Sequence, residues 1–144
     1  MPNAVLIDVA DAVVADLNAA TLSQPVTAAR TYLPQFDLKE MTTLHVTVVP
    51  KAEGIAVASR ASTQHDYSVD VGVQKKLAAG NNAEIDPLML LAQEIADYFR
   101  FRPLVGRPER WVRTEVKAPY SPEHLDQLRQ FTSVVTLTFR GMRS

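Results

Sequence analysis

The side chains best suited to acid–base or metal chemistry in this sequence are its three histidines, His45, His65 and His124. No two of them have the spacing at which histidines share a metal ion. His65 and Asp66 are neighbours in a segment that alternates as a strand does, and consecutive strand side chains point to opposite faces. The histidines therefore indicate structural positions rather than a catalytic or metal-binding site.

The carboxylates offer no better candidate for paired acid–base catalysis. Asp66 and Asp70 lie on one face of a predicted strand, but a spacing of four residues separates them by roughly 13 Å, too far for two carboxyl groups that act together. The sequence contains no cysteine, no glycine-rich phosphate loop and no G-x-S-x-G motif. We therefore expect no catalytic residue, no metal and no cofactor, and we expect that the protein is not an enzyme.

Basic side chains gather in one short segment, where they alternate with the aromatic residues Phe99, Phe101 and Trp111. The candidate interface residues are Arg100, Arg102, Arg107, Arg110 and Arg113. Arginine and tryptophan are favoured anchors of protein interfaces, and basic residues between aromatic ones can also hold nucleic acid. A third interpretation is a solvated rim around a core tryptophan. All three interpretations remain open at this point.

Charge is divided unevenly along a chain whose net charge is only −1. Residues 1–97 hold 6 basic and 12 acidic side chains, and residues 98–144 hold 9 and 4. Such a division indicates either an acidic and a basic face on one molecule or two halves that interleave so that the charges mix. No apolar run approaches the roughly 20 residues of a membrane span. The acidic N-terminal segment predicts no signal peptide.

Two segments alternate between apolar and polar residues as half-buried strands do. They are residues 64–76 and residues 131–140, and residues 44–49 predict another strand. Pro50 is expected to end that strand, with a turn at residues 51–54 and a short strand at residues 55–61. The short connections predict antiparallel pairing.

Apolar residues at helical spacing predict two main helices, at residues 4–19 and 86–101. Asp86 and Pro87 suit the N-cap and the first position of the second helix, and a short helix is expected at 121–128. The length of 144 residues predicts a single domain, 1–144. We expect an α+β fold in which both helices pack on one face of an antiparallel sheet. The predicted core residues include Val69, Val71, Leu91, Ile95, Val135 and Leu137.

Several segments together resemble small neck and tail proteins of tailed bacteriophages and prophages, and the resemblance spans almost the whole chain. These segments are DVADAVVADLNAA, LHVTVVPK, QHDYSVDVGVQKKL, EIDPLMLLAQEIADYFRFR and APYSPEHLDQLRQFTSVVTLTFR. The order of elements is similar to that of the tail terminator and tail completion family.

The resemblance implies a tail-terminator-like fold and a homo-oligomeric, hexameric ring that caps the tail tube and joins it to the head. Its implied partners are the tail tube protein and a head-completion or connector protein, with no membrane and with DNA held at most non-specifically in the lumen. The implied location is the virion neck or tail, after assembly in the host cytoplasm. The alternatives are a non-virion accessory or nucleic-acid-binding assembly protein and a small enzyme. A ring also suits the charge division, because a repeated heterologous contact needs two complementary surfaces.

Overall fold

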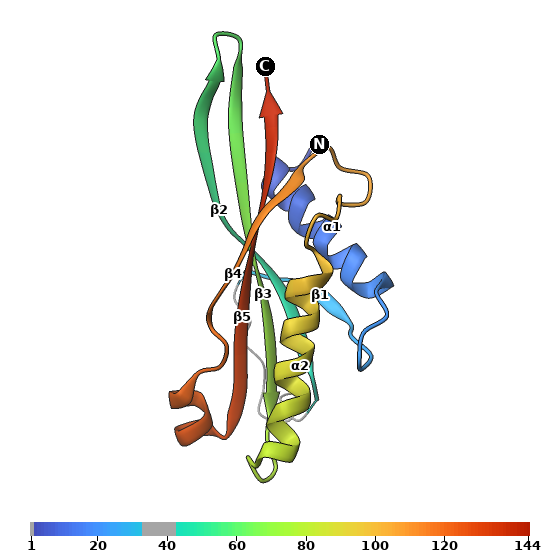
Figure 1. Cartoon of the computed structure of the whole chain (residues 1–144), viewed down its shortest axis with the longest axis vertical. Coiled ribbons are helices and arrows are strands. Elements are labelled where there is room, and N and C mark those ends of the chain that lie inside the picture. The colour runs from blue at the N-terminus through green and yellow to red at the C-terminus, as the bar shows by residue number, and fades with distance from the viewer. Residues whose placement is uncertain (1, 33–42) are drawn as a thin grey trace.

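The computed structural model describes residues 2–32 and 43–144, which form a five-stranded sheet with two helices on one of its faces (Figure 1). This arrangement confirms the α+β fold class. The strands lie in the order β1-β2-β3-β5-β4. In chain order, the elements are α1 (Val5–Ala19), β1 (Ala28–Arg30), β2 (His45–Ser59), β3 (Ser62–Lys76), α2 (Asn82–Tyr98), β4 (Arg110–Ala118), the π-helical turn η2 (His124–Leu128) and β5 (Gln130–Arg143).

The expectation of a purely antiparallel sheet is wrong at one edge, because β1 pairs in parallel with β2, with Ala28 opposite Val46. The other pairings, β2 with β3, β3 with β5 and β4 with β5, are antiparallel. A parallel pair needs a connection of a dozen or more residues. The chain between Arg30 and His45 is long enough for that crossover, whereas the hairpin between β2 and β3 is not. Most of the crossover, residues 33–42, lies outside the described residues.

The predictions that Pro50 ends a strand and that residues 51–54 form a turn are wrong, because β2 continues to Ser59. The backbone carbonyl of Val48 accepts a hydrogen bond from Thr31, so it faces the β1 side. Pro50, two residues further along, faces the same outer edge, beyond the end of β1. A proline on an outer edge removes no hydrogen bond from the ladder. A bulge between Pro50 and Ala52 then absorbs one extra residue.

The second main helix begins at Asn82, earlier than the predicted start at Asp86, and ends at Tyr98. The Asn81 side chain caps it by accepting a hydrogen bond from the backbone N–H of Glu84, at 3.1 Å. The Glu84 carboxylate in turn accepts from the backbone N–H groups of residues 78–80, and these bonds lower its pKa. Pro87 therefore lies inside the helix rather than at its first position.

Both helices cover the same face of the sheet, α1 over β1, β2 and β3, and α2 over β5 (Figure 1). The alternation predicted for β3 is confirmed, since Tyr67, Val69, Val71 and Val73 are buried under the helices. The side chains of the opposite face are mostly polar and half-buried. All six predicted core residues are fully buried: Val69, Val71, Leu91, Ile95, Val135 and Leu137.

Candidate assembly surfaces

His65 and His124 are both hydrogen-bonded to neighbouring side chains. His65 is buried, and its ring nitrogens lie 2.9 Å from a Glu53 carboxylate oxygen and 2.8 Å from the Thr63 hydroxyl. His124 bonds the Thr132 hydroxyl at 2.8 Å. Residues 2–32 and 43–144 contain no group of three or more His, Asp or Glu side chains that could hold a metal ion. In the same ranges no helix is long and apolar enough to cross a membrane.

Asp66 and Asp70 lie on the same face of the sheet, as predicted. This is the open face, the one that the helices do not cover, and each carboxylate is hydrogen-bonded within the chain. The Arg140 guanidinium donates to both carboxylate oxygens of Asp66, at 2.8 and 3.2 Å. These hydrogen bonds lower the pKa of Asp66. Asp70 accepts from the Thr136 hydroxyl at 2.7 Å. Each carboxylate therefore stabilises the pairing of β3 with β5.

Arg107, one of the five candidate interface arginines, is half-buried and forms an ion pair with a buried carboxylate. Its guanidinium donates to both oxygens of the buried Glu109 carboxylate, at 2.9 and 3.2 Å, and lies 3.8 Å from Asp8. The bonds to Glu109 raise the pKa of Arg107. Gly141 makes room for this pair, because a Cβ there would lie 3.2 Å from the Glu109 side chain. The contact between Arg107 and Asp8 also joins a basic residue from the C-terminal part of the sequence to an acidic residue from the N-terminal part.

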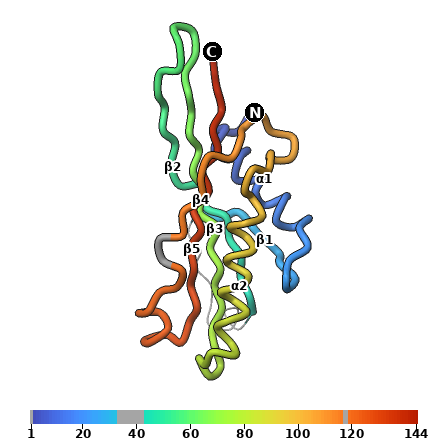
Figure 2. The backbone as a smooth tube through the Cα atoms, in the orientation of Figure 1, coloured from blue at the N-terminus to red at the C-terminus, as the bar shows by residue number. Residues whose placement is uncertain are grey.

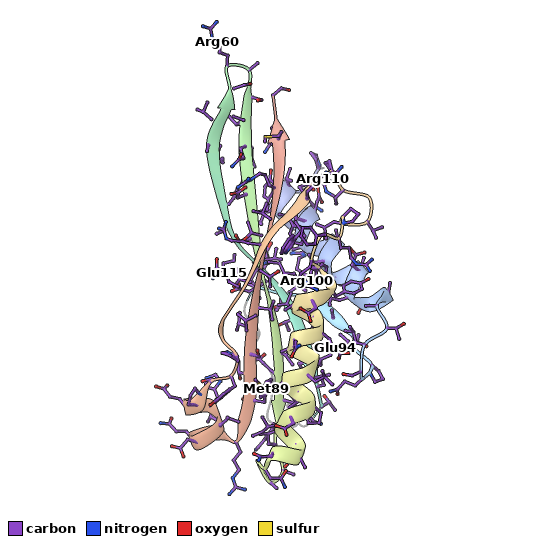
Figure 3. All side chains as sticks on the ribbon, in the orientation of Figure 1. Arg60, Met89, Glu94, Arg100, Arg110 and Glu115 are labelled. Atoms are coloured by element: carbon purple, nitrogen blue, oxygen red, sulfur yellow. The ribbon has the colours of Figure 1, made fainter. Side chains whose placement is uncertain are left out.

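The other four arginines are exposed. Arg100 lies 3.9 Å from Asp97, and Arg113 donates to Glu115 at 3.2 Å. Arg110 forms no ion pair within the part of the chain that the structure describes. Figure 3 places Arg100 and Arg110 at separate positions beside the lower and upper ends of the loop between α2 and β4.

Arg102 and Arg110 border a hollow that we call the aromatic corner, formed by Phe101, Arg102, Pro103, Arg110 and Trp111. The Phe101 side chain is 86% exposed and meets the Trp111 ring edge-on, with 5.0 Å between centroids. Its backbone adopts φ 56°, a left-handed conformation that is unusual for a bulky residue. Exposed aromatic and arginine side chains held this way are typical of interface anchors. The sequence indicated the segment but not that Phe101 is the exposed ring.

The longest projection of the molecule is the distal half of the β2–β3 hairpin, residues 51–66, which we call the arm. It extends beyond both helices with the end of β5 beside it (Figures 1 and 2). Glu53, Ile55 and Val57 lie on its helix-side face, because they pair with Tyr67, His65 and Thr63. Ile55 is 63% exposed and Val57 is 84% exposed.

The base of the arm is well ordered by polar contacts. The buried His65 ring joins Glu53 on β2 to Thr63 on β3 and stacks against the Tyr67 ring at 5.9 Å between centroids. Burial raises the pKa of Tyr67. On the opposite face of the arm, Lys51 approaches Asp70 at 3.7 Å, and the next β2 residues on that face are the small Ala52, Gly54 and Ala56. The arm is therefore an ordered β-hairpin whose two large aliphatic side chains lie on one face.

Comparisons with known proteins find matches among solved structures. No protein-family model and no curated protein sequence matches the chain. Among solved structures, the chain is similar to one from "Virion of native gene transfer agent (GTA) particle", with 16% identity and a TM-score of 0.44. The match covers 94% of this chain and 92% of that one.

Proposed function

We propose that the protein is a non-catalytic structural subunit of a phage-type virion, a tail terminator or tail completion protein at the neck. The observation that carries this proposal is the arm, which holds Ile55 and Val57 in solvent on an ordered hairpin. A monomer gains no stability from leaving aliphatic side chains exposed, whereas an assembly surface needs them. The resemblance of the sequence to neck and tail proteins supports the same role.

The presence of more than one exposed surface supports a ring. The arm and the aromatic corner are different surfaces of the molecule, and a contact in which the arm of one copy meets a different surface of its neighbour is heterologous rather than symmetric. A heterologous contact repeated by rotation closes into a ring. In this proposal a hexamer caps the tail tube and presents its other side to a head-completion or connector protein. The exposed arginines Arg100, Arg102, Arg110 and Arg113 then face a neighbouring subunit or partner.

The aromatic corner also favours a second candidate function, binding of nucleic acid by a non-virion accessory protein. Aromatic rings and arginines can stack on bases and neutralise phosphates. The internal pairing of Arg107 with Glu109 and of Arg113 with Glu115 reduces the number of guanidinium groups available to phosphates. Retention of DNA that falls steeply with salt would favour this second function.

Deletion of the gene from the phage or prophage that encodes the protein tests the proposal. We expect filled heads and tails that do not join, with tails of abnormal length, and restoration of joined particles by the wild-type gene supplied in trans. Mass spectrometry of purified particles from the parent phage should detect the protein. Finished, head-joined tails in the deletion strain would contradict the proposed function.

A further inference from the structure

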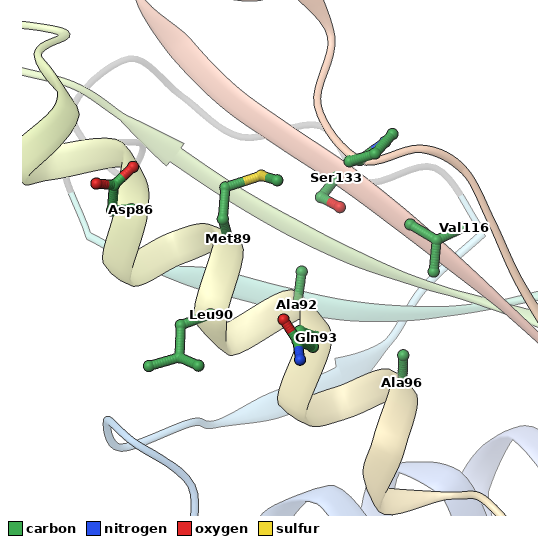
Figure 4. A pocket seen from close by; sticks show the side chains of 9 residues that line it. Asp86, Met89, Leu90, Ala92, Gln93, Ala96, Val116 and Ser133 are labelled. Atoms are coloured by element: carbon green, nitrogen blue, oxygen red, sulfur yellow. The ribbon is translucent and has the colours of Figure 1, made fainter.

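An apolar groove of about 540 Å³ runs between α2 and the β4–β5 edge of the sheet. Figure 4 shows Met89 and Ala92 directed from α2 toward Ser133 on β5, with Val116 beyond them. The residues that line the groove are Asp86, Met89, Leu90, Ala92, Gln93, Ala96, Val116, Pro119 and Ser133.

The groove has a local cause in the sequence. The pairing of β4 with β5 shifts register between Glu115 and Ala118, so β4 departs from a regular ladder beside α2. On the helix side, Ala92 and Ala96 are too small to fill the space. The Ser133 hydroxyl at the groove is buried and has no hydrogen-bond partner within the described residues. Unfilled apolar space of this kind indicates a surface that an apolar occupant completes.

The arm of the same molecule cannot be this occupant. Figure 3 places Arg60, at the tip of the arm, at the opposite end of the molecule from Met89 in the groove. The arm and the groove are therefore available to different neighbours of the same chain.

We propose that the arm of a second copy of this chain docks in the groove, with Ile55 and Val57 against α2. This inference rests on the proposed function, for which it names the contact between ring subunits. The spacing of the two surfaces supports it. Ile55 and Val57 are about 6.6 Å apart along a strand, and Ala96 and Ala92 are about 6 Å apart along a helix. Each aliphatic side chain thus lies over one turn of α2, Ile55 at the half-buried Ala96 and Val57 at the turn that holds the half-buried Met89 and the buried Ala92.

Charge supports this orientation of the arm, in which its tip points toward the N-terminal end of α2. Helix α2 carries four acidic residues and no lysine or arginine, and one of them, Asp86, lines the groove. Asp86 precedes Ala92 by about 9 Å of helix. Arg60 lies three residues beyond Val57, within about 10 Å along the arm. With Val57 at Ala92, the exposed Arg60 therefore reaches the Asp86 carboxylate of the neighbouring copy.

The contact uses two different surfaces of each copy, so every subunit gives its arm to one neighbour and receives the arm of another. Such a contact is heterologous and generates a closed ring when the rotation closes. Opposite charges at the arm tip and on α2 also disfavour pairing of arm with arm or of groove with groove.

Disulfide trapping tests the contact directly, because the natural chain has no cysteine. Purified Ile55→Cys and Ala96→Cys variants, with tags of different size, are mixed at high concentration and mildly oxidised. The control mixture pairs Ala96→Cys with Leu128→Cys, since Leu128 on η2 is similarly exposed. We expect about tenfold more mixed dimer than in the control, the difference that a contact of about 1.4 kcal/mol produces. Equal yields in the two mixtures would overturn the inference, whether or not rings form in solution.

A charge exchange adds a test that does not depend on core packing, since Arg60 and Asp86 are both exposed. Arg60→Glu on the Ile55→Cys chain, or Asp86→Arg on the Ala96→Cys chain, should lower the trapped yield. The two changes together should restore it. A yield that stays low in the combined mixture would contradict the proposed register of the arm in the groove.

The outcomes separate this inference from the proposed function. Efficient trapping by a protein that is absent from purified particles would refute the neck role and leave the contact standing. Particles that contain the protein and assemble normally, combined with control-level trapping, would refute the contact and leave the neck role standing.

Discussion

The two ends of the β2–β3 hairpin differ sharply although they belong to the same two strands. Near α1, Val46, Val48, Val69 and Val71 are buried between the sheet and the helices. In the arm, every residue from 51 to 61 is exposed. Hydrogen-bonded pairing continues along the whole hairpin, so backbone pairing keeps the arm extended where no helix covers it. The helices therefore define the core, and the surfaces available for assembly begin where the helices end.

The largest expected effect of a single substitution on stability lies where the helices cover the sheet. Leu91→Ala or Ile95→Ala removes a fully buried side chain from the contact between α2 and the sheet. We expect a loss of about 2–5 kcal/mol in the free energy of unfolding, measured by urea denaturation. A loss below about 0.5 kcal/mol would show that these side chains do not hold α2 on the sheet.

The ion pair between Arg107 and the buried Glu109 should rank next. Glu109→Ala leaves Arg107 without its two short hydrogen bonds and with only the 3.8 Å contact to Asp8. We expect a loss of about 1–3 kcal/mol in unfolding free energy. The matched control is Asp97→Ala, which removes the exposed partner of Arg100 and should cost no more than about 1 kcal/mol. Equal losses would contradict the distinction between the two pairs.

Acid should weaken the open face of the sheet through Asp66. Its pKa in the folded state is lowered from 3.8 by the hydrogen bonds from Arg140. The resulting stabilisation is therefore fully present above pH 3.8 and is lost as the pH falls below that value through the folded-state pKa. Asp66→Asn should lower the unfolding free energy at pH 6 and cost progressively less at lower pH. A constant difference down to pH 2 would contradict this assignment.

The smallest expected effect on stability lies at the arm. Val57→Ser changes a side chain that is 84% exposed and should alter the unfolding free energy by less than about 0.5 kcal/mol. The same substitution should weaken the contact between copies, because it removes apolar area from the docking face. Light scattering on concentrated protein and urea denaturation on dilute protein separate the two effects. A large loss of stability would show that Val57 is part of the monomer core.

The sequence predicted well the part of the sheet that the helices cover, because burial on one face leaves a periodic pattern of apolar residues. Strict alternation identified the buried face of β3 and β5, and helical spacing identified Leu91 and Ile95. The arm was missed because Pro50 and the segment 51–54 have the composition of a turn. Only the position of β1 shows that Pro50 faces an outer edge, where its missing N–H matters little.

The candidate interface could be predicted only in part, because ion pairs and grooves depend on contacts between distant segments. Arg107 was grouped with the exposed arginines, yet it bonds Glu109 and approaches Asp8. No spacing rule indicates the groove, since it depends on the irregular pairing of β4 beside the alanines of α2. The charge division of the sequence did not predict two faces, because pairs such as Arg140 with Asp66 join the two halves.

Disulfide trapping inside assembled particles tests directly whether the arm of each subunit lies in the groove of the next. Particles are produced with the Ile55→Cys, Ala96→Cys double variant as the only source of the protein, then oxidised and separated on a non-reducing gel. We predict a ladder of linked subunits that ends at the size of the closed ring and collapses to monomer on reduction. A Leu128→Cys, Ala96→Cys variant should give monomer only. Particles that contain the double variant but yield only monomer would show that the arms do not dock on the α2 grooves of neighbouring subunits.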